Sequence, residues 1–284
     1  MKVCIASGKG GTGKTLISTS LAAVLSEHEP VQLLDCDVDA PNAHLFLGPS
    51  IRQRVPVVVT VPRVDDEACV HCGECAQACR FKAIASLPKA TLVYDELCHS
   101  CGVCVEACPT GAIAEVKREI GVVEIGSAGD IAFVQGAVHI GEARNGPVIA
   151  AVKSYSDRGA TVLLDAPPGT SCPVVQTLRG CDLALLVTEP TPFGLSDLRL
   201  AVQTARAMGI PFGVVINRDG LGDNRVDAYC ETEAIPIWAR IPHDRAIAEA
   251  SARGERAVET SPALRSAVER IAERLRVYED ERRR

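Results

Sequence analysis

The sequence has few aromatic residues, no long hydrophobic run and no excess of positive charge. Aromatic side chains make up 4% of its 284 residues, while Ala, Val, Ile and Leu supply most of the apolar content. Small branched side chains suit buried parallel strands covered by helices on both faces, so the composition predicts an α/β fold. No apolar run approaches the roughly 18 residues that a membrane-spanning helix needs, which argues against an integral membrane protein.

The lack of positive charge bears on the partners. The net charge is -6, and the only basic run is Arg282–Arg284. This composition gives no support to nucleic-acid binding. The first residues, Met1–Ile5, lead straight into a Gly-rich loop and leave no room for a signal peptide. We therefore expect a cytoplasmic protein with neither a nucleic-acid partner nor a membrane partner.

Cysteine, in contrast, is abundant. Eight of the 13 cysteines fall between Cys69 and Cys108. In a reducing compartment such clustering is typical of metal ligation rather than of disulfides. The dispersed cysteines are predicted to be small buried hydrophobic residues; they are Cys4, Cys36, Cys172, Cys181 and Cys230.

Short apolar runs alternate with helical stretches along most of the chain. The first run, Lys2–Ala6, precedes the Gly-rich loop, and apolar residues at helical spacing follow it. Five more predicted strands are Val31–Cys36, Thr161–Ala166, Leu183–Thr188, Phe212–Asn217 and Ile235–Ile241. Helical stretches between them include Leu195–Met208 and Asp244–Ala252. This alternation predicts a mainly parallel sheet flanked by helices.

The alternation breaks where the clustered cysteines lie. We predict one domain from residues 1–61 and 120–284, with residues 62–119 inserted into it. The insert repeats with a period of 29 residues, since Asp66–Cys69 matches Asp95–Cys98, which indicates two duplicated half-modules. After it, Gly121–Gly146 is predicted to form short antiparallel strands that belong with the outer domain.

The Gly-rich loop carries the phosphate-binding motif G-x-x-x-x-G-K-[ST], between a strand and a helix as that motif requires. Its backbone N–H groups turn toward phosphate oxygens, Lys14 bridges the β- and γ-phosphates, and Thr15 ligates Mg²⁺. The alternative, a Gly-rich turn that merely starts a helix, is disfavoured by the complete motif. The predicted nucleotide-binding residues of the loop are Gly8, Lys9, Gly10, Gly11, Thr12, Gly13, Lys14 and Thr15.

With its additional Lys9, the loop resembles the deviant Walker A motif of the MinD/ParA and nitrogenase iron protein class of P-loop ATPases. The resemblance implies a homodimer with ATP at its interface. In such a dimer Lys9 reaches the phosphates bound by the partner subunit. Without the surrounding motif, Lys9 would be interpreted as a solvated loop charge.

Four further residues match the motifs of this class. Asp37, after the second strand, matches the aspartate that activates the attacking water, and Asp165 matches the Walker B carboxylate that holds a Mg²⁺-bound water. Gly169 matches the glycine whose N–H senses the γ-phosphate, and Asn217 matches an adenine-contacting asparagine. The alternatives are helix caps for the aspartates and a turn-forming role for Asn217. The resemblance thus assigns catalysis to Lys9, Lys14 and Asp37.

The clustered cysteines follow the spacing C-x2-C-x2-C-x3-C twice, as in bacterial ferredoxins with two [4Fe-4S] clusters. In that pattern the fourth cysteine of each run ligates the cluster of the other run. One set is therefore Cys69, Cys72, Cys75 and Cys108, and the other is Cys98, Cys101, Cys104 and Cys79. A pair of four-cysteine zinc sites is the alternative, but zinc modules usually separate two C-x2-4-C units by a longer gap. We expect ATP, Mg²⁺ and two [4Fe-4S] clusters as cofactors.

Cys172, Trp238 and the last helix lie outside these motifs. Cys172 lies at the offset from Asp165 at which the nitrogenase iron protein has a ligand of its subunit-bridging cluster, but no second cysteine follows at the matching spacing. We expect a buried or interface thiol there. Trp238 is expected to pack in or beside the core. The last helix has an apolar stripe that should pack on a core, and it does not resemble the membrane-targeting helix of MinD.

The chain as a whole resembles MinD-superfamily ATPases with an inserted ferredoxin domain. The resemblance implies first an ATP-gated redox protein, whose nucleotide-driven dimer switching controls electron delivery to a partner metalloenzyme. The second hypothesis is a cluster carrier or assembly ATPase of the Mrp type. The others are a positioning ATPase whose clusters sense redox state and an amide-forming synthase of the cobyrinic acid a,c-diamide type. For the last, the chain has no obvious glutaminase domain.

Overall fold

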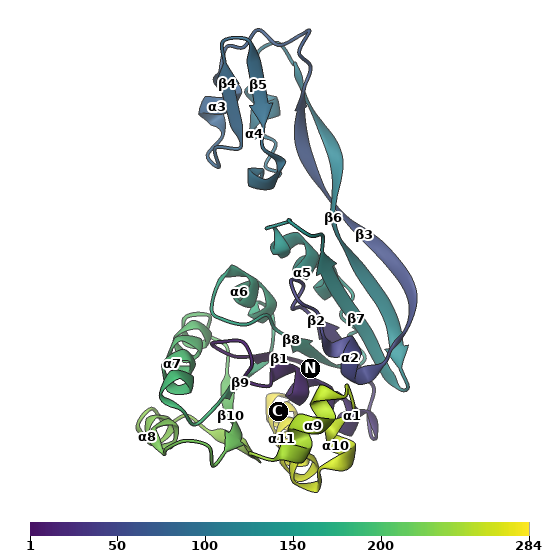
Figure 1. Cartoon of the computed structure of the whole chain (residues 1–284), viewed down its shortest axis with the longest axis vertical. Helices are drawn as coiled ribbons and strands as arrows, with labels where there is room; N and C mark the ends of the chain where they lie inside the picture. Colours follow the sequence, from purple (N-terminus) through teal and green to yellow (C-terminus); the bar gives the residue numbers. More distant parts are fainter. Residues whose placement is uncertain (284) are drawn as a thin grey trace.

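The computed structural model describes residues 1–283, most of which surround one large sheet (Figure 1). The sheet has nine strands in the order β11-β10-β9-β1-β8-β2-β7-β6-β3. Its strands are β1 (Lys2–Ala6), β2 (Val31–Asp35), β3 (Ser50–Val64), β6 (Ile113–Ala128), β7 (Ile131–Val138), β8 (Thr161–Asp165), β9 (Leu183–Thr188), β10 (Phe212–Asp219) and β11 (Ile237–Pro242). From β11 to β7 all neighbours are parallel, whereas β6 pairs antiparallel with both β7 and β3. The predicted mainly parallel sheet is confirmed.

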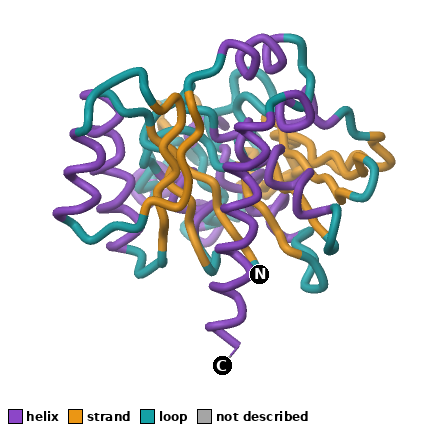
Figure 2. Tube along the Cα trace, turned by 90° about the horizontal axis from the view of Figure 1, so that it is seen from below, coloured by secondary structure: helices purple, strands orange, loops and turns teal. Residues whose placement is uncertain are grey.

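Helices cover both faces of the sheet. Figure 2 shows the strands of the sheet, in orange, lying between helices, in purple. One face is covered by α1 (Lys14–Ser26), α9 (Arg245–Ala252), α10 (Ala257–Thr260) and α11 (Pro262–Arg283). The other face carries α5 (Asn145–Ser154), α6 (Cys172–Leu178), α7 (Pro192–Ala207) and α8 (Arg225–Thr232). The short α2 (Ala43–Leu47) follows β2. No helix in this described part of the chain combines the length and apolarity needed to cross a membrane.

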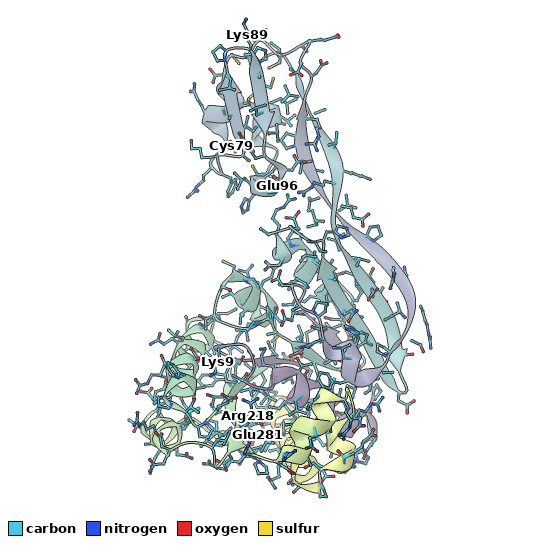
Figure 3. All side chains as sticks on the ribbon, viewed as in Figure 1. Lys9, Cys79, Lys89, Glu96, Arg218 and Glu281 are labelled. Atoms are coloured by element: carbon cyan, nitrogen blue, oxygen red, sulfur yellow. The ribbon has the colours of Figure 1, made fainter. Side chains whose placement is uncertain are left out.

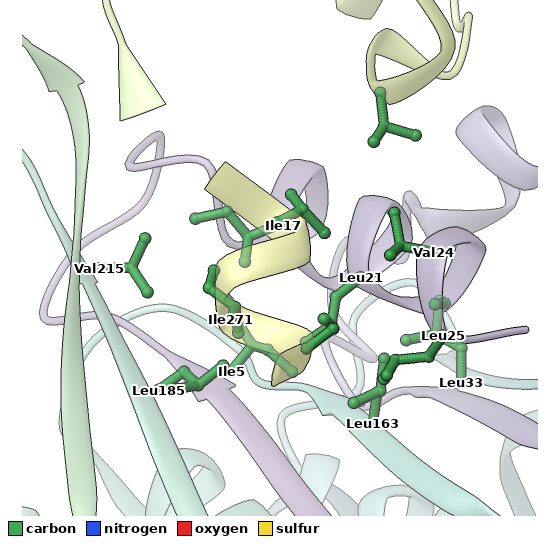
Figure 4. Packing of buried hydrophobic residues seen from close by; sticks show 14 of the residues in the cluster. Ile5, Ile17, Leu21, Val24, Leu25, Leu33, Leu163, Leu185, Val215 and Ile271 are labelled. Atoms are coloured by element: carbon green, nitrogen blue, oxygen red, sulfur yellow. The ribbon is translucent and has the colours of Figure 1, made fainter. Parts of the chain in front are cut away.

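The core on the α1 and α11 face joins helix and strand side chains that are fully buried (Figure 4). Leu21 of α1 and Ile271 of α11 meet Ile5 and Leu163 of the neighbouring strands β1 and β8. Trp238 of β11 belongs to the same cluster, in line with its expected packing role. Aliphatic side chains of the helices and of the sheet thus form the core on this face.

The six predicted strands are all present, with ends shifted by at most two residues. Within the nine-stranded sheet, the sequence did not predict β3, which has 15 residues and forms the edge. Pro56 and Pro62 interrupt its apolar pattern, and proline is tolerated at an edge because its missing N–H needs no partner there. β6 is also longer than expected, with 16 residues.

β3 and β6 form one long antiparallel ribbon that runs from the sheet to the cysteine-rich segment (Figure 1). Beyond it lie α3 (Glu74–Ala78), β4 (Ile84–Leu87), β5 (Ala90–Val93), the 3₁₀ helix η1 (Asp95–Leu97) and α4 (Val103–Glu106). The pairing of Ile84 with Val93 in the β4–β5 hairpin is repeated 29 residues apart by that of Ile113 with Val64. The predicted limits at residues 62 and 119 lie within these continuous strands. We call residues 65–112 with the adjoining ends of β3 and β6 the cysteine module.

Candidate functional site

The phosphate loop connects the buried strand β1 to α1, which begins at Lys14. Gly13 has a φ of 95°, and a Cβ added to it would lie 2.3 Å from Nδ2 of Asn217. Glycine is therefore required there by both the backbone and the neighbouring side chain. Asn217 in turn donates a hydrogen bond from Nδ2 to the Thr12 carbonyl at 2.8 Å and accepts one from the Arg218 N–H at 2.9 Å. The predicted adenine-contacting residue thus supports the loop from β10.

Lys14 is buried beside three aspartates at the ends of β2 and β8. Burial lowers its pKa, opposed by the negative charges of Asp165, Asp37 and Asp35. Asp165 is 1% exposed, and neither of its carboxylate oxygens has a hydrogen-bond partner of ordinary geometry. Burial raises its pKa to about 6, although the nearby hydroxyls of Thr15 and Ser18 and the charge of Lys14 oppose the shift. Two unpartnered buried carboxylate oxygens are costly unless a cation or its water shell faces them. The donor set fits Mg²⁺ with Thr15 nearby in the loop.

Asp35 is a site residue that the sequence analysis missed. Its carboxylate accepts hydrogen bonds from the N–H groups of Asp37, Asn42 and Ala43 at 3.1, 3.1 and 3.0 Å. Burial and the charge of Asp165 raise the pKa of Asp35 to about 8. The signal was an acidic residue at the end of a fully buried strand. Asp35 fixes the segment of residues 37–42, which we call the first switch segment.

Asp37 lines a cavity of about 480 Å³. Five of the predicted loop residues line it too, namely Gly10, Gly11, Gly13, Lys14 and Thr15, whereas Gly8, Lys9 and Thr12 do not. Burial raises the pKa of Asp37 to about 6, although the positive charge of Lys14 opposes the shift. The other side of the cavity is formed by residues near α9 and the end of β10, which include Arg218, His243, Asp244 and Ile247. The cavity therefore joins the phosphate loop to an open space large enough for a nucleotide.

Gly169 and Lys9 are held by other parts of the same chain. Gly169 has a φ of 95°, which favours glycine, and its N–H donates to the Ser7 carbonyl at 3.1 Å. The Nζ of Lys9 lies 3.4 Å from Oε2 of Glu189, whose Oε1 accepts from Arg218 at 2.6 Å. Figure 3 shows Lys9 and Arg218 in the body of the molecule. We call residues 166–171, which contain Gly169, the second switch segment.

The eight clustered cysteines lie around two cavities. Cys79, Cys98, Cys101 and Cys104 line one, which we call the Cys98 cavity, together with apolar residues. Cys69, Cys72, Cys75 and Cys108 line the other, which we call the Cys69 cavity. The structure therefore brings together each of the two sets predicted from the spacing, with the fourth cysteine of each run crossing over.

The backbone around the cavities repeats with the sequence. Left-handed φ angles occur at His71 and Ser100, at Gly73 and Gly102, and at Lys82 and Gly111, each pair 29 residues apart. The N–H of Ala83 points at Sγ of Cys79 at 3.3 Å, and that of Ser100 at Sγ of Cys98 at 3.4 Å. Such N–H donors stabilise a thiolate. Within the described residues, no three His, Cys, Asp or Glu side chains form a site for a single metal ion.

The remaining cysteines are dispersed through the body. Cys4, Cys36 and Cys230 are buried and Cys181 is partly buried, as expected for small hydrophobic residues. Cys172, at the start of α6, is instead exposed in the single chain, so the expectation of a buried thiol is wrong for the isolated protomer. An interface position for Cys172 stays a prediction.

Comparison with known proteins adds relatives of two kinds. An uncharacterised protein of Methanocaldococcus jannaschii is 36% identical over 225 residues, which cover 78% of this chain and 80% of that protein. A protein of Pyrococcus horikoshii named an iron-sulfur cluster carrier protein is 25% identical over 293 residues, covering 96% of this chain and 85% of the relative.

The fold also matches solved structures. The septum site-determining protein MinD of Pyrococcus horikoshii, complexed with Mg-ADP, superposes with a TM-score of 0.59 at 22% identity, over 96% of this chain and 95% of that one. At this identity the likeness shows the fold, an α/β P-loop NTPase fold. The CobQ/CobB/MinD/ParA nucleotide binding domain matches residues 3–258. The chain therefore belongs to the CobQ/CobB/MinD/ParA family of nucleotide-binding proteins.

Proposed function

We propose that this protein is an ATPase that carries iron–sulfur clusters and releases them to acceptor proteins under the control of bound nucleotide. The observation that carries the proposal is the continuity of β3 and β6. Both strands belong to the nucleotide-binding sheet, and their far ends contribute Pro62, Ile113 and Glu115 to the walls of the two cysteine cavities. The same two strands thus belong to both parts of the molecule.

On the nucleotide side, each predicted residue has a role that its surroundings allow. Lys14 would supply positive charge to the phosphates, and Asp165 and Thr15 would hold Mg²⁺, which would neutralise charge on the phosphates. Asp37 at the cavity wall orients or deprotonates the attacking water. The family resemblance implies a homodimer in which Lys9 contacts the partner's phosphates, and a cytoplasmic location is expected.

On the cluster side, the donor set fits two [4Fe-4S] clusters. Each cluster needs four thiolate ligands, and each cavity has four cysteines with apolar neighbours that limit contact with water. In a carrier, the cluster is the cargo. The cysteine module would hold it until the nucleotide state favours transfer to acceptor thiols.

Two readings of the module compete. The family resemblance in the sequence favours electron transfer to a partner metalloenzyme, whereas the relative named an iron-sulfur cluster carrier protein favours the carrier. One observation favours electron transfer as the second candidate: each cavity takes cysteines from both half-modules. A cluster bound by cysteines of both half-modules can leave only if both half-modules release their thiolates. This arrangement favours retention of the cluster on the protein.

Measuring the transfer of clusters to an acceptor protein distinguishes the carrier from the electron-transfer protein. The protein is reconstituted anaerobically, mixed with apo-aconitase as the acceptor, and followed by aconitase activity with ATP, with ADP and with no nucleotide. A carrier should transfer clusters at a rate that depends on ATP, and Lys14→Ala should lose that dependence. Clusters that stay on the protein in all three states and, once reduced with dithionite and freed of its excess, reduce an added cytochrome would overturn the carrier proposal in favour of electron transfer.

A further inference from the structure

The turn between β7 and α5 contains a nearly buried ion pair that the motifs did not predict. Arg144 donates from Nε to Oε1 of Glu142 at 2.8 Å and from Nη2 to Oε2 at 3.1 Å. The two side chains are 9% and 2% exposed. Arg118 of β6 adds a second cation, 3.0 Å from Oε2 of Glu142. A bidentate, desolvated pair of this kind fixes the position of the guanidinium.

The third nitrogen of the same guanidinium contacts the cysteine module. Nη1 of Arg144 donates to the carbonyl oxygen of Cys98 at 2.8 Å. Cys98 lines the Cys98 cavity, and its neighbour Ser100 bonds the ribbon through a 2.6 Å contact to the Thr60 carbonyl. Arg144 thus connects the body of the molecule to one cysteine cavity and places a positive charge beside it.

The residue that follows Arg144 contacts the first switch segment. Nδ2 of Asn145 donates to Oδ2 of Asp39 at 3.1 Å, two residues beyond Asp37. A rearrangement of that segment would therefore act directly on the first residue of α5. It would also act on Arg144, which directly precedes that residue in the chain.

The second switch segment reaches α5 through α6, which follows it in the chain. Nε2 of Gln176 donates to the Gly146 carbonyl at 2.7 Å, and Nζ of Lys153 donates to the carbonyls of Gln176, Thr177 and Arg179 at 2.6 to 2.7 Å. These bonds tie α5 and α6 into one unit. At the start of α5, beside Arg144, the first switch segment contacts Asn145 and α6 contacts Gly146, while the Lys153 bonds hold α6 at the other end of α5.

We propose that Arg144 is a positioning residue that couples the nucleotide state to the Cys98 cavity and leaves the Cys69 cavity largely uncoupled. The inference rests on the proposed function, because it needs a cluster in each cavity and a nucleotide at the phosphate loop. When the switch segments move α5, the guanidinium shifts relative to the Cys98 carbonyl. The charge and hydrogen bonding near that cluster change, and its reduction potential follows.

The test measures the midpoint potentials of both clusters by EPR-monitored redox titration of the full chain. Asp37→Asn serves as the background that binds ATP without hydrolysing it, and each protein is titrated without nucleotide, with ADP and with ATP. ATP should shift one potential, that of the cluster whose spectrum changes in Cys98→Ser. Adding Arg144→Gln should abolish the shift, whereas Arg144→Lys, which keeps the charge but loses the bidentate geometry, should retain part of it.

Arg63→Gln is the matched control. Arg63 forms a bidentate pair with Asp95 at 2.7 and 2.6 Å, three residues before Cys98, and its other bond goes to its neighbour Pro62. Removing this cation alters the local charge without touching α5, so the ATP-induced shift should persist.

Hydrogen exchange of the cluster-free chain gives an independent readout: ATP should change amide protection at residues 98–102 in the parent protein and not in Arg144→Gln.

The outcomes separate this inference from the proposed function. Iron content near zero, or no ATP binding by the parent protein, contradicts the proposed function itself. Full iron content and ATP binding, with an ATP-induced shift that survives Arg144→Gln, overturns the role of Arg144 alone. Equal ATP-induced shifts in both clusters would contradict the selectivity for the Cys98 cavity. By reciprocity, reduction should change the ATP affinity of the parent protein, and that change should fall below about twofold in Arg144→Gln.

Discussion

Three aspartates meet at the carboxyl ends of two neighbouring strands. Asp35 of β2 and Asp165 of β8 are direct partners in the parallel register, and Asp37 lies two residues further along the chain. Lys14, from the adjacent phosphate loop, is the cation among them. Burial is the main cause of the raised pKa values of all three, and neighbouring carboxylates add to it: Asp165 acts on Asp35, Asp37 on Asp165, and Asp39 on Asp37. The carboxylate of Asp165 therefore suits a role facing the water ligands of a Mg²⁺ ion, rather than one of three direct carboxylate ligands.

The first prediction separates binding from hydrolysis. Lys14→Ala should weaken ATP binding about 100-fold, because it removes charge-assisted hydrogen bonds to the phosphates. Asp37→Asn should keep the ATP affinity but lower the turnover number by about 10² to 10³, because the attacking water loses its base. Calorimetric titration and phosphate release measure the two effects. Equal ATP affinity in the parent protein and Lys14→Ala would contradict the assignment of the loop.

The second prediction concerns pH and rests on Asp35. Its folded pKa of about 8 lies above its ordinary value of 3.8, so the folded state holds a proton that the unfolded state releases. This contribution to stability is fully present below about pH 4 and is lost as the pH rises through about 8, at up to about 1.4 kcal/mol per pH unit. Without Mg²⁺ and nucleotide, the free energy of unfolding should therefore fall from pH 6 to pH 8.

Urea unfolding in EDTA at pH 6, 7 and 8 tests this prediction. Asp35→Asn is the comparison, since an amide accepts a hydrogen bond but does not titrate, and its stability should depend much less on pH. Mg²⁺ with ATP should also reduce the pH dependence, because a bound cation favours the ionised carboxylates. A slope that is the same in the parent protein and in Asp35→Asn would exclude Asp35 as its source.

At the scale of whole elements, the ribbon of β3 and β6 was the least predictable part of the fold. Buried strands such as β1 and β8 are continuous apolar runs, which the sequence analysis located to within one residue. β3 instead contains Arg52, Gln53 and Arg54 and two prolines, because it is an edge strand with one side open to water. Its pairing with β6 joins residues far apart in sequence, such as Ser50 and Ser127. No local pattern encodes such a contact.

The difference between local sequence patterns and long-range contacts also explains which site residues could be predicted from the sequence. Lys14, Asp165 and the cysteines follow short motifs in which spacing alone implies the chemistry. Glu142 and Arg144 belong to no motif, and their importance depends on where the ribbon places Cys98. The roles of Asn217 and Lys9 were inferred from a dimeric, nucleotide-bound family, whereas in this single chain they hold Thr12 and Glu189.

The third prediction tests the packing of α11. Ile271 is fully buried against α1 and the sheet (Figure 4), so Ile271→Ala should lower the free energy of unfolding by about 2 to 5 kcal/mol. Val277, on the same helix, is 54% exposed, and Val277→Ala should change stability by no more than about 0.5 kcal/mol. Urea denaturation of both variants makes the comparison. Similar losses in the two would mean that the helix is not packed as described.

At the scale of the whole molecule, the ribbon of β3 and β6 joins the cysteine module to the body, and the bond of Arg144 to Cys98 adds a second connection. Figure 3 shows Glu96 at the end of the module that faces the body and Lys89 at its far end. The contact of Arg144 with Cys98 lies on the facing side. The two cavities therefore differ in their contact with the body, since Arg144 bonds to Cys98 of one of them, even though the half-modules that form them are repeats.

The fourth prediction concerns cluster content. Protein prepared anaerobically should contain about eight iron and eight sulfide per chain, because two sets of four cysteines each hold one [4Fe-4S] cluster. Cys98→Ser should lower the iron to about four, whereas Cys172→Ser should leave it unchanged. Iron and sulfide assays measure both variants. A preparation that holds only zinc after anaerobic reconstitution would contradict the cluster assignment, and a loss of half the iron in Cys172→Ser would make Cys172 a ligand.

The fifth prediction concerns the dimer. Lys9 must leave Glu189 to reach a partner's phosphates, and their 3.4 Å pair with Lys9 about one-third exposed is worth at most about 1 kcal/mol. Glu189 then keeps its 2.6 Å bond to Arg218, so no buried charge is left unpaired. Phosphate contacts with a lysine exceed this small cost. ATP should therefore shift the Asp37→Asn protein from its 30.1 kDa monomer toward twice that mass.

Light scattering after gel filtration measures the mass at several protein concentrations. Lys9→Ala in the Asp37→Asn background should bind ATP but stay monomeric at concentrations where Asp37→Asn alone is dimeric, because its lost contact lies across the interface. Lys89→Ala, which removes an exposed lysine of the cysteine module, is the control and should dimerise normally. If the Lys9 and Lys89 variants dimerise at the same concentration, Lys9 does not contact the partner's nucleotide. Its ion pair with Glu189 would then persist when ATP is bound.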